Sequence, residues 1–306
     1  MIYDVIIIGG GPAGISAAIY SVSRGLKTIL LEKSGVGGVI GTVSSVTHYS
    51  GIIEEETGET FSKRMEKQAI DSGVNILKEE VLSVYLEDPV KKIQTTNGIY
   101  ETKTIIIAAG STPRRLNIPG ENALLGKGVC ISTTKDAMKF SNRNIYVVGG
   151  SDGAIKEALY LSKFAKKLTI IHFEEKLSAI NEFLNKVNNN DKIELKLNSR
   201  IIEIQGTDSI EGFNIQNQNT GHIETVKDKN CGIFIYAGST PNTNLFHQLK
   251  YENDYIKTND KMETNIPGVY AAGDIRVKQV RQVATAVSDG SIAAINCELY
   301  IKSLSN

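Results

Sequence analysis

The fold is decided by the stretch Val5-Ile6-Ile7-Ile8-Gly9-Gly10-Gly11-Pro12-Ala13-Gly14. Four β-branched residues in succession predict a strand that is buried on both faces of a parallel sheet. The spacing Gly-x-Gly-x-x-Gly is typical of the turn between the first strand and first helix of a dinucleotide-binding unit. A helix is predicted over residues 15–24 and a second strand over 26–31, which ends at Glu32.

Each glycine of this turn has a separate physical task. Gly9 permits the tight turn, Gly11 lets backbone N–H groups approach a pyrophosphate, and Gly14 lets the helix pack against the strand. The helix N-terminus offers partial positive charge to the phosphates. Glu32 accepts hydrogen bonds from a ribose 2′-hydroxyl and repels a 2′-phosphate. The complete pattern predicts a dinucleotide site.

A second strand-turn-helix-strand pattern spans residues 144–171, with Gly149-Gly150-Ser151-Asp152-Gly153-Ala154 as its turn. The duplication predicts an α/β protein with two Rossmann-like, three-layer dinucleotide-binding domains. The second turn differs from the first in two respects. Ser151 occupies the position of Gly11 and crowds a pyrophosphate, and His172-Phe173-Glu174 follows the second strand with no arginine to hold a 2′-phosphate.

Composition excludes several classes of function. The chain has 306 residues with 34 basic and 34 acidic side chains, so the formal net charge is zero. Nucleic-acid-binding proteins carry a basic surplus, and anionic membranes attract basic surfaces, so neither partner is expected. The apolar runs are too short to cross a bilayer and the chain opens without a targeting segment, which predicts a cytoplasmic protein.

The three cysteines, Cys130, Cys231 and Cys297, lie far apart in the sequence. They form no Cys-x-x-Cys motif and no His/Cys spacing suited to a metal, so no metal site is expected. We expect them to be buried thiols that act as small apolar residues.

Two further strands are predicted to end in small residues, at Ala108-Ala109-Gly110 and at Ala272-Gly273-Asp274. A carboxylate delivered by a buried strand can accept a hydrogen bond from a sugar-alcohol hydroxyl. A helix is predicted over residues 281–294, and its N-terminus can point at a ligand.

Together these motifs resemble the low-molecular-weight thioredoxin reductases, flavoproteins of the class II pyridine nucleotide-disulfide oxidoreductase type. The resemblance covers essentially the whole chain. It rests on Gly9-x-Gly11-x-x-Gly14 with Glu32, Gly37-Gly38, Ala108-Ala109-Gly110, Ile118-Pro119-Gly120-Glu121, and Ala272-Gly273-Asp274 followed by Arg281-Gln282-Val283. It implies a split FAD-binding domain (1–113 and 241–306), an inserted NADPH-binding domain (114–240) and a homodimer.

The resemblance implies an FAD site assembled from both halves of the split domain. Its expected members are Gly9, Gly11, Pro12, Ala13, Gly14, Glu32, Lys33, Gly38, Val39, His48, Val81, Ala109, Gly110, Gly273, Asp274, Arg281, Gln282 and Val283. Val39 replaces the family's glutamine near the flavin. His48 is expected beside the isoalloxazine, as a proton donor or as a packing residue.

The resemblance also exposes departures in the inserted domain. The family's redox Cys-x-x-Cys matches Ser132-Thr133-Thr134-Lys135 here, and Asp136 matches the acid that follows it. Disulfide exchange needs an attacking thiolate and a resolving thiol, and Cys130 has no partner in this segment. Candidate catalytic residues are therefore Lys135, Asp136 and His48. The family's His-Arg-Arg signature is His172-Phe173-Glu174, which makes NADPH use improbable and NADH use weak.

Three functions remain open at this stage. The first is an FAD-dependent oxidoreductase that exchanges electrons with a protein carrier, ferredoxin or flavodoxin, or with a small molecule. The second is a nicotinamide-dependent thioredoxin-disulfide reductase that uses displaced cysteines. The third is a flavin-bound redox sensor without turnover.

Overall fold

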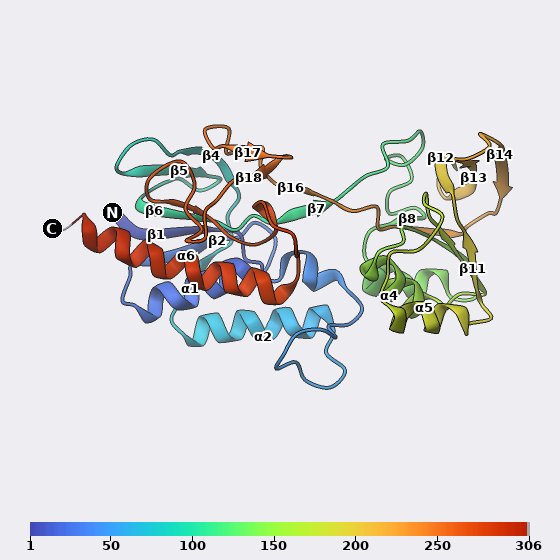
Figure 1. The fold of residues 1–306 in the computed structure, drawn as a ribbon, viewed down its shortest axis with the longest axis horizontal. Coiled ribbons are helices and arrows are strands. Elements are labelled where there is room, and N and C mark those ends of the chain that lie inside the picture. The colour runs from blue at the N-terminus through green and yellow to red at the C-terminus, as the bar shows by residue number, and fades with distance from the viewer. Residues whose placement is uncertain (305–306) are drawn as a thin grey trace. The chain divides into compact units, whose positions relative to one another are not determined.

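The structure is a computed structural model and describes residues 1–304. The chain forms two compact units, each built on its own sheet (Figure 1). The first unit comprises Met1–Gly41, Ser45–Thr112 and Thr240–Asn306, and the second comprises Thr42–Ser44 and Pro113–Ser239. The predicted α/β class, with one Rossmann-like unit inserted in another, is confirmed.

The sheet of the first unit has the strand order β3-β2-β1-β6-β5-β4, and β19 also pairs with β6. Strands β1, β2, β3, β6 and β19 pair in parallel, whereas β4 and β5 are antiparallel. The bounds are β1 Ile2–Ile8, β2 Thr28–Leu31, β3 Asn75–Leu77, β4 Val81–Tyr85, β5 Lys91–Thr95, β6 Ile99–Ile107 and β19 Val269–Ala271. This order puts the carboxyl end of β1, where the first glycine turn begins, in the middle of the parallel strands.

Three helices belong to the first unit: α1 (Pro12–Ser23), α2 (Gly58–Asp71) and α6 (Val283–Ser303). Helices α1 and α6 lie side by side (Figure 1). Their backbones approach so closely that a Cβ on Gly290 would lie 2.1 Å from the carbonyl oxygen of Ala13. The Ser16 hydroxyl donates to the Val287 carbonyl across the same contact, at 2.8 Å.

Helix α6 differs from the helix predicted over residues 281–294. It begins at Val283, because Gln282 is its N-cap and the Gln282 N–H donates to Thr285 Oγ1 at 3.2 Å. It continues to Ser303, well beyond the predicted end. Small residues on its buried face pack against α1. This tertiary contact stabilises the helix beyond residue 294, where the prediction ended.

The second unit has a five-stranded parallel sheet of order β11-β10-β9-β15-β8 and an antiparallel sheet of order β12-β13-β14. The bounds are β8 Val129–Cys130, β9 Asn144–Val148, β10 Lys167–Ile171, β11 Ile193–Lys196, β12 Ser199–Gly206, β13 Ile210–Asn217, β14 Ile223–Lys227 and β15 Gly232–Ile235. Helices α4 (Asp152–Leu161) and α5 (Asn181–Asn188) complete the unit.

Alternation along the strands explains the three layers of the second unit. Ile145 and Val147 of β9 belong to the apolar cluster that includes α4 and α5. Tyr146 and Val148 belong to the opposite cluster, with β12 and β13. Successive side chains of a strand point to opposite faces, so the parallel sheet is covered by helices on one side and by the antiparallel sheet on the other.

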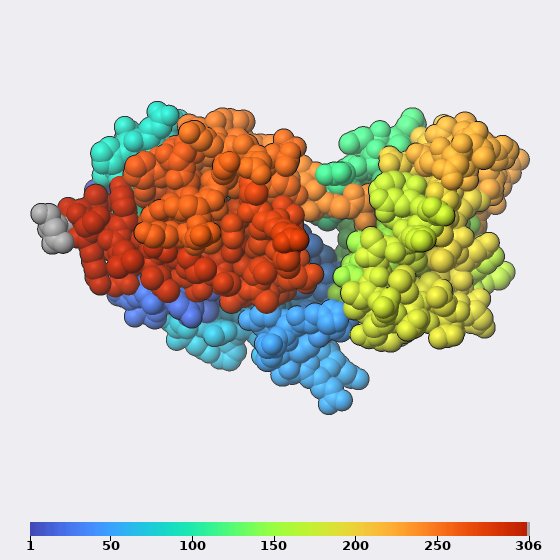
Figure 2. All heavy atoms as spheres, viewed as in Figure 1, coloured from blue at the N-terminus to red at the C-terminus, as the bar shows by residue number. Residues whose placement is uncertain are grey.

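Short elements complete the chain. They are α3 (Thr133–Asp136), the 3-10 helices η1 (Gly38–Thr42), η2 (Ala137–Phe140) and η3 (Gly273–Ile275), and the strands β7 (Ser111–Pro113), β16 (Ser239–Pro241), β17 (Tyr251–Glu252) and β18 (Tyr255–Ile256). In the face shown by Figure 2, the orange and red atoms of the C-terminal segment form most of the visible surface of the first unit. Within residues 1–304, no helix has the length and apolarity that a membrane crossing requires.

Candidate dinucleotide-binding sites

The first glycine turn is held by contacts within the protein. Gly9 has a φ of +107°, and a Cβ there would lie 2.4 Å from the Ala108 carbonyl oxygen. Only glycine tolerates both the backbone angle and the close approach. The Gly9 N–H donates to Leu31 O at 2.9 Å, so the turn is tied to the end of β2.

The space above Gly11 is different. Its φ of −73° suits any residue, and a Cβ there would meet nothing closer than the Gly37 carbonyl oxygen at 3.9 Å. Protein packing therefore gives no reason for glycine at this position. A pyrophosphate close to the N-terminus of α1 gives one, because a side chain would occupy the path of the phosphates. The residues present fit the predicted FAD.

Glu32 closes the turn from the end of β2. Its Oε2 accepts from the Gly10 N–H at 2.7 Å, and its Oε1 accepts from the Ser34 N–H at 2.8 Å. Oε1 accepts a second hydrogen bond from the Gly35 N–H at 3.3 Å, so the remaining acceptor capacity lies at Oε2. The side chain is therefore fixed by the backbone and keeps acceptor capacity for ribose hydroxyls.

Asp274 lies in η3, directly after β19. Its Oδ1 is buried and has no hydrogen-bond partner among the side chains and backbone of residues 1–304. Burial raises the pKa of this carboxyl above its usual range, while the charges of Lys278 and Arg281 counteract part of the rise. A buried acceptor without a partner is costly, and a sugar-alcohol hydroxyl of FAD would satisfy it.

Several predicted FAD residues converge on this turn. The Gly37 N–H donates to Gly10 O at 2.9 Å, which brings the segment of Gly38 to the turn. A Cβ on Gly273 would lie 2.9 Å from the Cβ of Ala13. The turn, the 37–38 segment and the 273–274 segment are therefore neighbours.

The other predicted FAD residues have the following contacts and exposure. Lys33 is exposed and pairs with Glu80 at 3.4 Å. His48 is exposed, and its Nδ1 lies 3.4 Å from the Thr47 hydroxyl. Val81 packs against the core of the first unit. Val39 is exposed in η1. Gln282 is the N-cap of α6, and Val283 is its first residue. The Arg281 guanidinium carbon lies 4.0 Å from the centre of the Tyr255 ring.

Asn242 is a residue that the sequence reading missed. Its Nδ2 donates to Ala109 O at 2.7 Å and its backbone N–H donates to Gly110 O at 3.0 Å, so it braces the end of β6. A signal was available, because Ala-Gly-Ser-Thr-Pro occurs twice, at 109–113 and at 237–241. The two copies contribute the paired strands β7 and β16.

The second glycine turn repeats the geometry of the first. Gly149 has a φ of +137°, and a Cβ there would lie 2.4 Å from the Tyr236 carbonyl oxygen. Ser151 precedes α4 with φ −79° and ψ 168°, close to the −73° and −178° of Gly11. The serine therefore fits without backbone strain, but its side chain extends where the first turn leaves open space.

The end of β10 carries His172 at the position where β2 carries Glu32. The imidazole is buried against Gly150, and its Nε2 lies 3.2 Å from Glu174 Oε2. The Arg200 guanidinium lies 4.6 Å from the centre of the Phe173 ring. Arg200 comes from β12, so a cation lies near this strand end although the local sequence His172-Phe173-Glu174 has none.

The segment that matches the family's redox motif carries hydroxyls and a lysine. Lys135 is exposed on α3. The Asp136 carboxylate accepts from the Lys139 ammonium at 2.7 Å. The Thr133 hydroxyl is hydrogen-bonded to the hydroxyl of Tyr236, whose pKa is raised mainly by burial. Asp136 is thus engaged by a lysine.

All three cysteines are buried and free of disulfides. Burial, with a smaller effect of Asp136, raises the pKa of Cys130 to about 12, and burial raises the pKa of Cys231 to about 12 as well. Burial also raises the pKa of Cys297. At neutral pH these thiols are protonated, and the thiolate is the form that attacks a disulfide.

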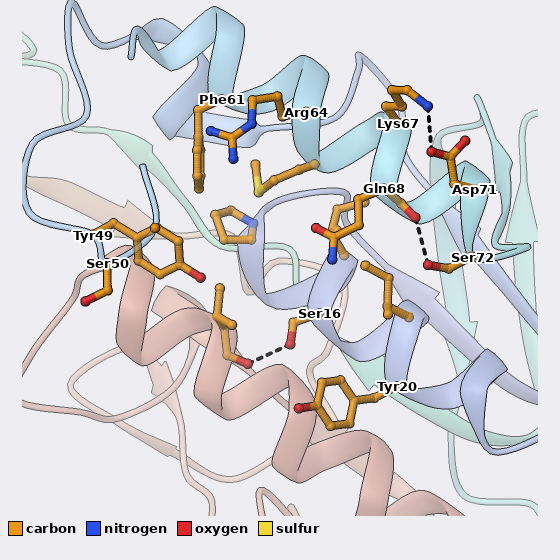
Figure 3. Close-up of a pocket in the computed structure, with 16 residues that line it drawn as sticks. Ser16, Tyr20, Tyr49, Ser50, Phe61, Arg64, Lys67, Gln68, Asp71 and Ser72 are labelled. Carbon is orange, nitrogen blue, oxygen red and sulfur yellow. Dashed lines mark hydrogen bonds and ion pairs between the residues drawn. The ribbon is translucent and has the colours of Figure 1, made fainter. Parts of the chain in front are cut away.

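A separate hollow of about 660 Å³ lies between α1 and α2 (Figure 3). Ser16 and Tyr20 line it from α1, Phe61 and Arg64 line it from α2, and Tyr49 lines it from the connecting segment. Neither Glu32 nor Asp274 belongs to its lining. Within residues 1–304, no three His, Cys, Asp or Glu side chains are grouped to hold a metal ion.

Comparisons with known proteins agree with this geometry. The family model of the pyridine nucleotide-disulphide oxidoreductases matches residues 3–290. A thioredoxin reductase of Peptoclostridium acidaminophilum is 40% identical over 307 residues, which cover 98% of each chain. The crystal structure of Lactococcus lactis thioredoxin reductase (FR conformation) superposes with a TM-score of 0.94 at 37% identity, covering 98% of this chain and 99% of that one. A ferredoxin-flavin thioredoxin reductase from Clostridium acetobutylicum has a TM-score of 0.56 at 28% identity, covering 100% and 99%.

Proposed function

Because this chain belongs to the pyridine nucleotide-disulphide oxidoreductase family, we propose that its flavin exchanges electrons directly with a partner outside the chain, without a disulfide of its own. The chain is an FAD-dependent oxidoreductase similar to thioredoxin reductases. FAD, when bound, supplies the two-electron chemistry. The residues that would hold it are the Gly9–Gly14 turn, Glu32 and Asp274.

The observation that carries this proposal is the state of the thiols. Ser132 and Lys135 stand where the resemblance places the redox cysteines. The nearest thiol, Cys130, is buried with a raised pKa, and its Sγ lies 3.5 Å from the Gly128 carbonyl oxygen. A protonated, buried thiol is a poor nucleophile, and no second thiol stands in the segment to resolve a mixed disulfide.

The partner that we propose is a protein electron carrier, ferredoxin or flavodoxin, or a small molecule. One structural relative carries ferredoxin in its own name, which supports a carrier of this type. For the second unit we propose weak NADPH binding and somewhat better NADH binding. Ser151 crowds the pyrophosphate, and Glu174 repels a 2′-phosphate while accepting hydrogen bonds from a free 2′-hydroxyl.

Rapid anaerobic mixing of the FAD-loaded protein with NADH, NADPH and reduced ferredoxin, each alone, tests the proposal. We expect fast bleaching of the flavin by ferredoxin, slow bleaching by NADH and the least by NADPH. Fast reduction by NADPH with half-saturation in the micromolar range would overturn it.

The second candidate is disulfide reduction with displaced cysteines. Relatives named thioredoxin reductase favour it, and reduction of thioredoxin by the purified protein with any donor would establish it. A flavin-bound sensor is the third, and it predicts no bleaching by any donor. We further propose a cytoplasmic homodimer on the strength of the resemblance, with light scattering after gel filtration as the test.

A further inference from the structure

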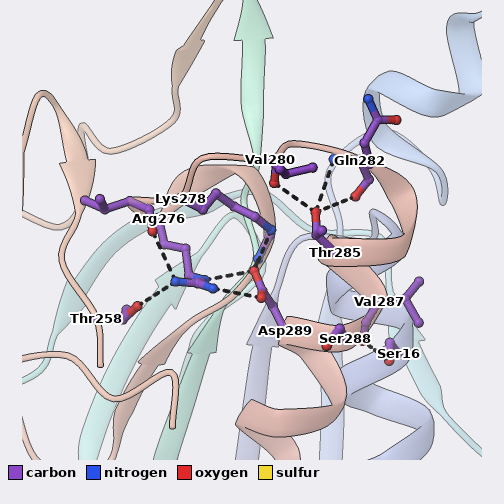
Figure 4. Close-up of polar contacts among 12 residues, drawn as sticks. Ser16, Thr258, Arg276, Lys278, Val280, Gln282, Thr285, Val287, Ser288 and Asp289 are labelled. Carbon is purple, nitrogen blue, oxygen red and sulfur yellow. Dashed lines mark hydrogen bonds and ion pairs between the residues drawn. The ribbon is translucent and has the colours of Figure 1, made fainter. Parts of the chain in front are cut away.

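Figure 4 shows a cluster of one acid, Asp289, and two cations, Arg276 and Lys278. Lys278 and Asp289 also act electrostatically on Asp274. Asp289 of α6 accepts from Arg276 Nε at 2.9 Å, from Arg276 Nη2 at 3.0 Å and from Lys278 Nζ at 2.7 Å. The side chains of Lys278 and Asp289 are each only 6% exposed, and that of Arg276 is 16% exposed. Such shielding from water leaves their charges little screened.

The cluster is tied to the backbone of the candidate FAD site. Asp289 Oδ2 also accepts from the Gly273 N–H at 3.0 Å. Gly273 has a φ of +80° and immediately precedes Asp274. Asp289, which lies on α6, therefore fixes the turn after β19 that carries Asp274.

The net charge of the cluster bears on the protonation of Asp274. Two cations and one carboxylate leave a net charge of +1 beside Asp274. The charged groups that face Asp274 are Lys278, Arg281 and Asp289. Burial raises the pKa of Asp274, Lys278 and Arg281 lower it, and Asp289 raises it again. Burial alone would also raise the pKa of Asp289, but the hydrogen bonds from Arg276 and Lys278 outweigh it, so Asp289 stays ionised.

We propose that Arg276, Lys278 and Asp289 are positioning residues of the FAD site. Asp289 sets the backbone of Gly273, and the surplus positive charge keeps the buried Asp274 carboxylate ionised so that it can accept a hydrogen bond from an FAD hydroxyl. This inference rests on the chain's binding of FAD.

The test is titration of the apoprotein with FAD between pH 5 and pH 8, with quenching of FAD fluorescence as the readout. Lys278→Met takes the cluster from +1 to 0, and Asp289→Asn takes it to +2. Lys278→Arg keeps the charge. Lys302→Met is the matched control, because Lys302 is an exposed lysine of α6, the helix that carries Asp289, and it pairs with Glu298.

Protonated Asp274 binds FAD less well, so affinity falls as the pH drops through the pKa of Asp274. We expect Lys278→Met to weaken FAD binding by about 10- to 100-fold at pH 7, the range for a lost hydrogen bond to a charged group, and to move the pH midpoint upward. Asp289→Asn should move the midpoint downward. Lys278→Arg and Lys302→Met should stay within about threefold of the wild type, a difference well under 1 kcal/mol.

Midpoints that move in the same direction in Lys278→Met and Asp289→Asn, or do not move, would overturn the inference, since a purely structural cluster weakens binding at every pH. Thermal melting of each apoprotein reports whether it is folded. If Asp289→Asn is unfolded, Lys278→Met against Lys278→Arg decides, and equal midpoints in those two would overturn the inference. A wild-type apoprotein that takes up no FAD would overturn the chain's assignment as a flavoprotein, and this inference with it.

Discussion

The two glycine turns have the same backbone geometry and different chemistry. Gly9 and Gly149 both have positive φ, and in both a Cβ would lie 2.4 Å from a carbonyl oxygen of the protein. The third position of each turn differs. A side chain on Gly11 would meet open space, and at the matching position the second turn has the side chain of Ser151. After the following strand, the first unit has an acid and the second has His172.

The comparison separates two kinds of constraint. Gly9 and Gly149 are glycine in both turns, because their positive φ and their contact with a backbone carbonyl exclude a side chain, whereas Gly14 is matched by Ala154. Gly11 and Ser151, the positions expected to face a dinucleotide, differ, and the protein's own packing does not require glycine at position 11. On the proposed function, the first unit keeps the residues that suit FAD, while the second unit keeps the fold and differs at the positions expected to meet a nicotinamide dinucleotide.

The largest expected effect is on the first turn. Gly11→Val should lower bound FAD from about one per chain to below about a tenth, because the side chain blocks the pyrophosphate. Absorbance of the purified protein measures it. Ser151→Val is the matched control in the second turn and should leave the yellow colour unchanged. A Gly11→Val protein that keeps its full FAD would break the comparison.

The next largest expected effect is a gain of NADPH affinity in the second unit, from changes after β10. Phe173→Arg with Glu174→Arg supplies two cations for a 2′-phosphate, and two such contacts are worth roughly 3–6 kcal/mol in the best case. We expect NADPH affinity to rise at least about tenfold relative to NADH, by titration calorimetry. Glu175→Arg adds one cation next to the site and should have little effect. An unchanged NADPH affinity in the double variant would mean that Ser151 alone closes the site.

Lys135 tests whether the second unit acts on the flavin through charge. A single positive charge about 6 Å from the flavin, at an effective dielectric near 20, raises the two-electron reduction potential of the flavin by about 50 mV. Lys135 is exposed and water screens it, so Lys135→Met should lower the midpoint by less than that. Spectroelectrochemical titration at one pH measures the shift, with Lys139→Met as the control. A shift below about 10 mV, far under that Coulomb value, removes Lys135 from the candidate catalytic residues.

The smallest expected effect is that of Cys130→Ser. Its thiol is buried and protonated, so the variant should retain the flavin reduction rate of the wild type with every donor. Stopped-flow bleaching measures this, and the melting temperature shows whether the buried serine has destabilised the unit. Loss of electron transfer in a folded Cys130→Ser protein would reveal a thiol partner and revive disulfide chemistry.

Local patterns in the sequence were enough to predict both turns. Val5–Ile8, the three glycines and Glu32 lie within one continuous stretch, and each acts on its neighbours. Arg200 and Asn242 were missed because their partners are distant in the chain, and only the folded sheets bring them together. Asp289 was missed for the same reason, since a lone acid on a small-residue helix carries no signal of the two cations that enclose it.

The first unit is discontinuous: β19 and α6 come from the last part of the chain, yet they pair with β6 and pack on α1. During synthesis, α1 therefore emerges well before α6, and the face of α1 that Gly290 later contacts is exposed to water until then. The second unit, apart from three residues, is a continuous segment that emerges earlier. Domains tend to fold as units as they emerge, so the inserted unit can fold before residues 269–303 emerge to complete the first unit.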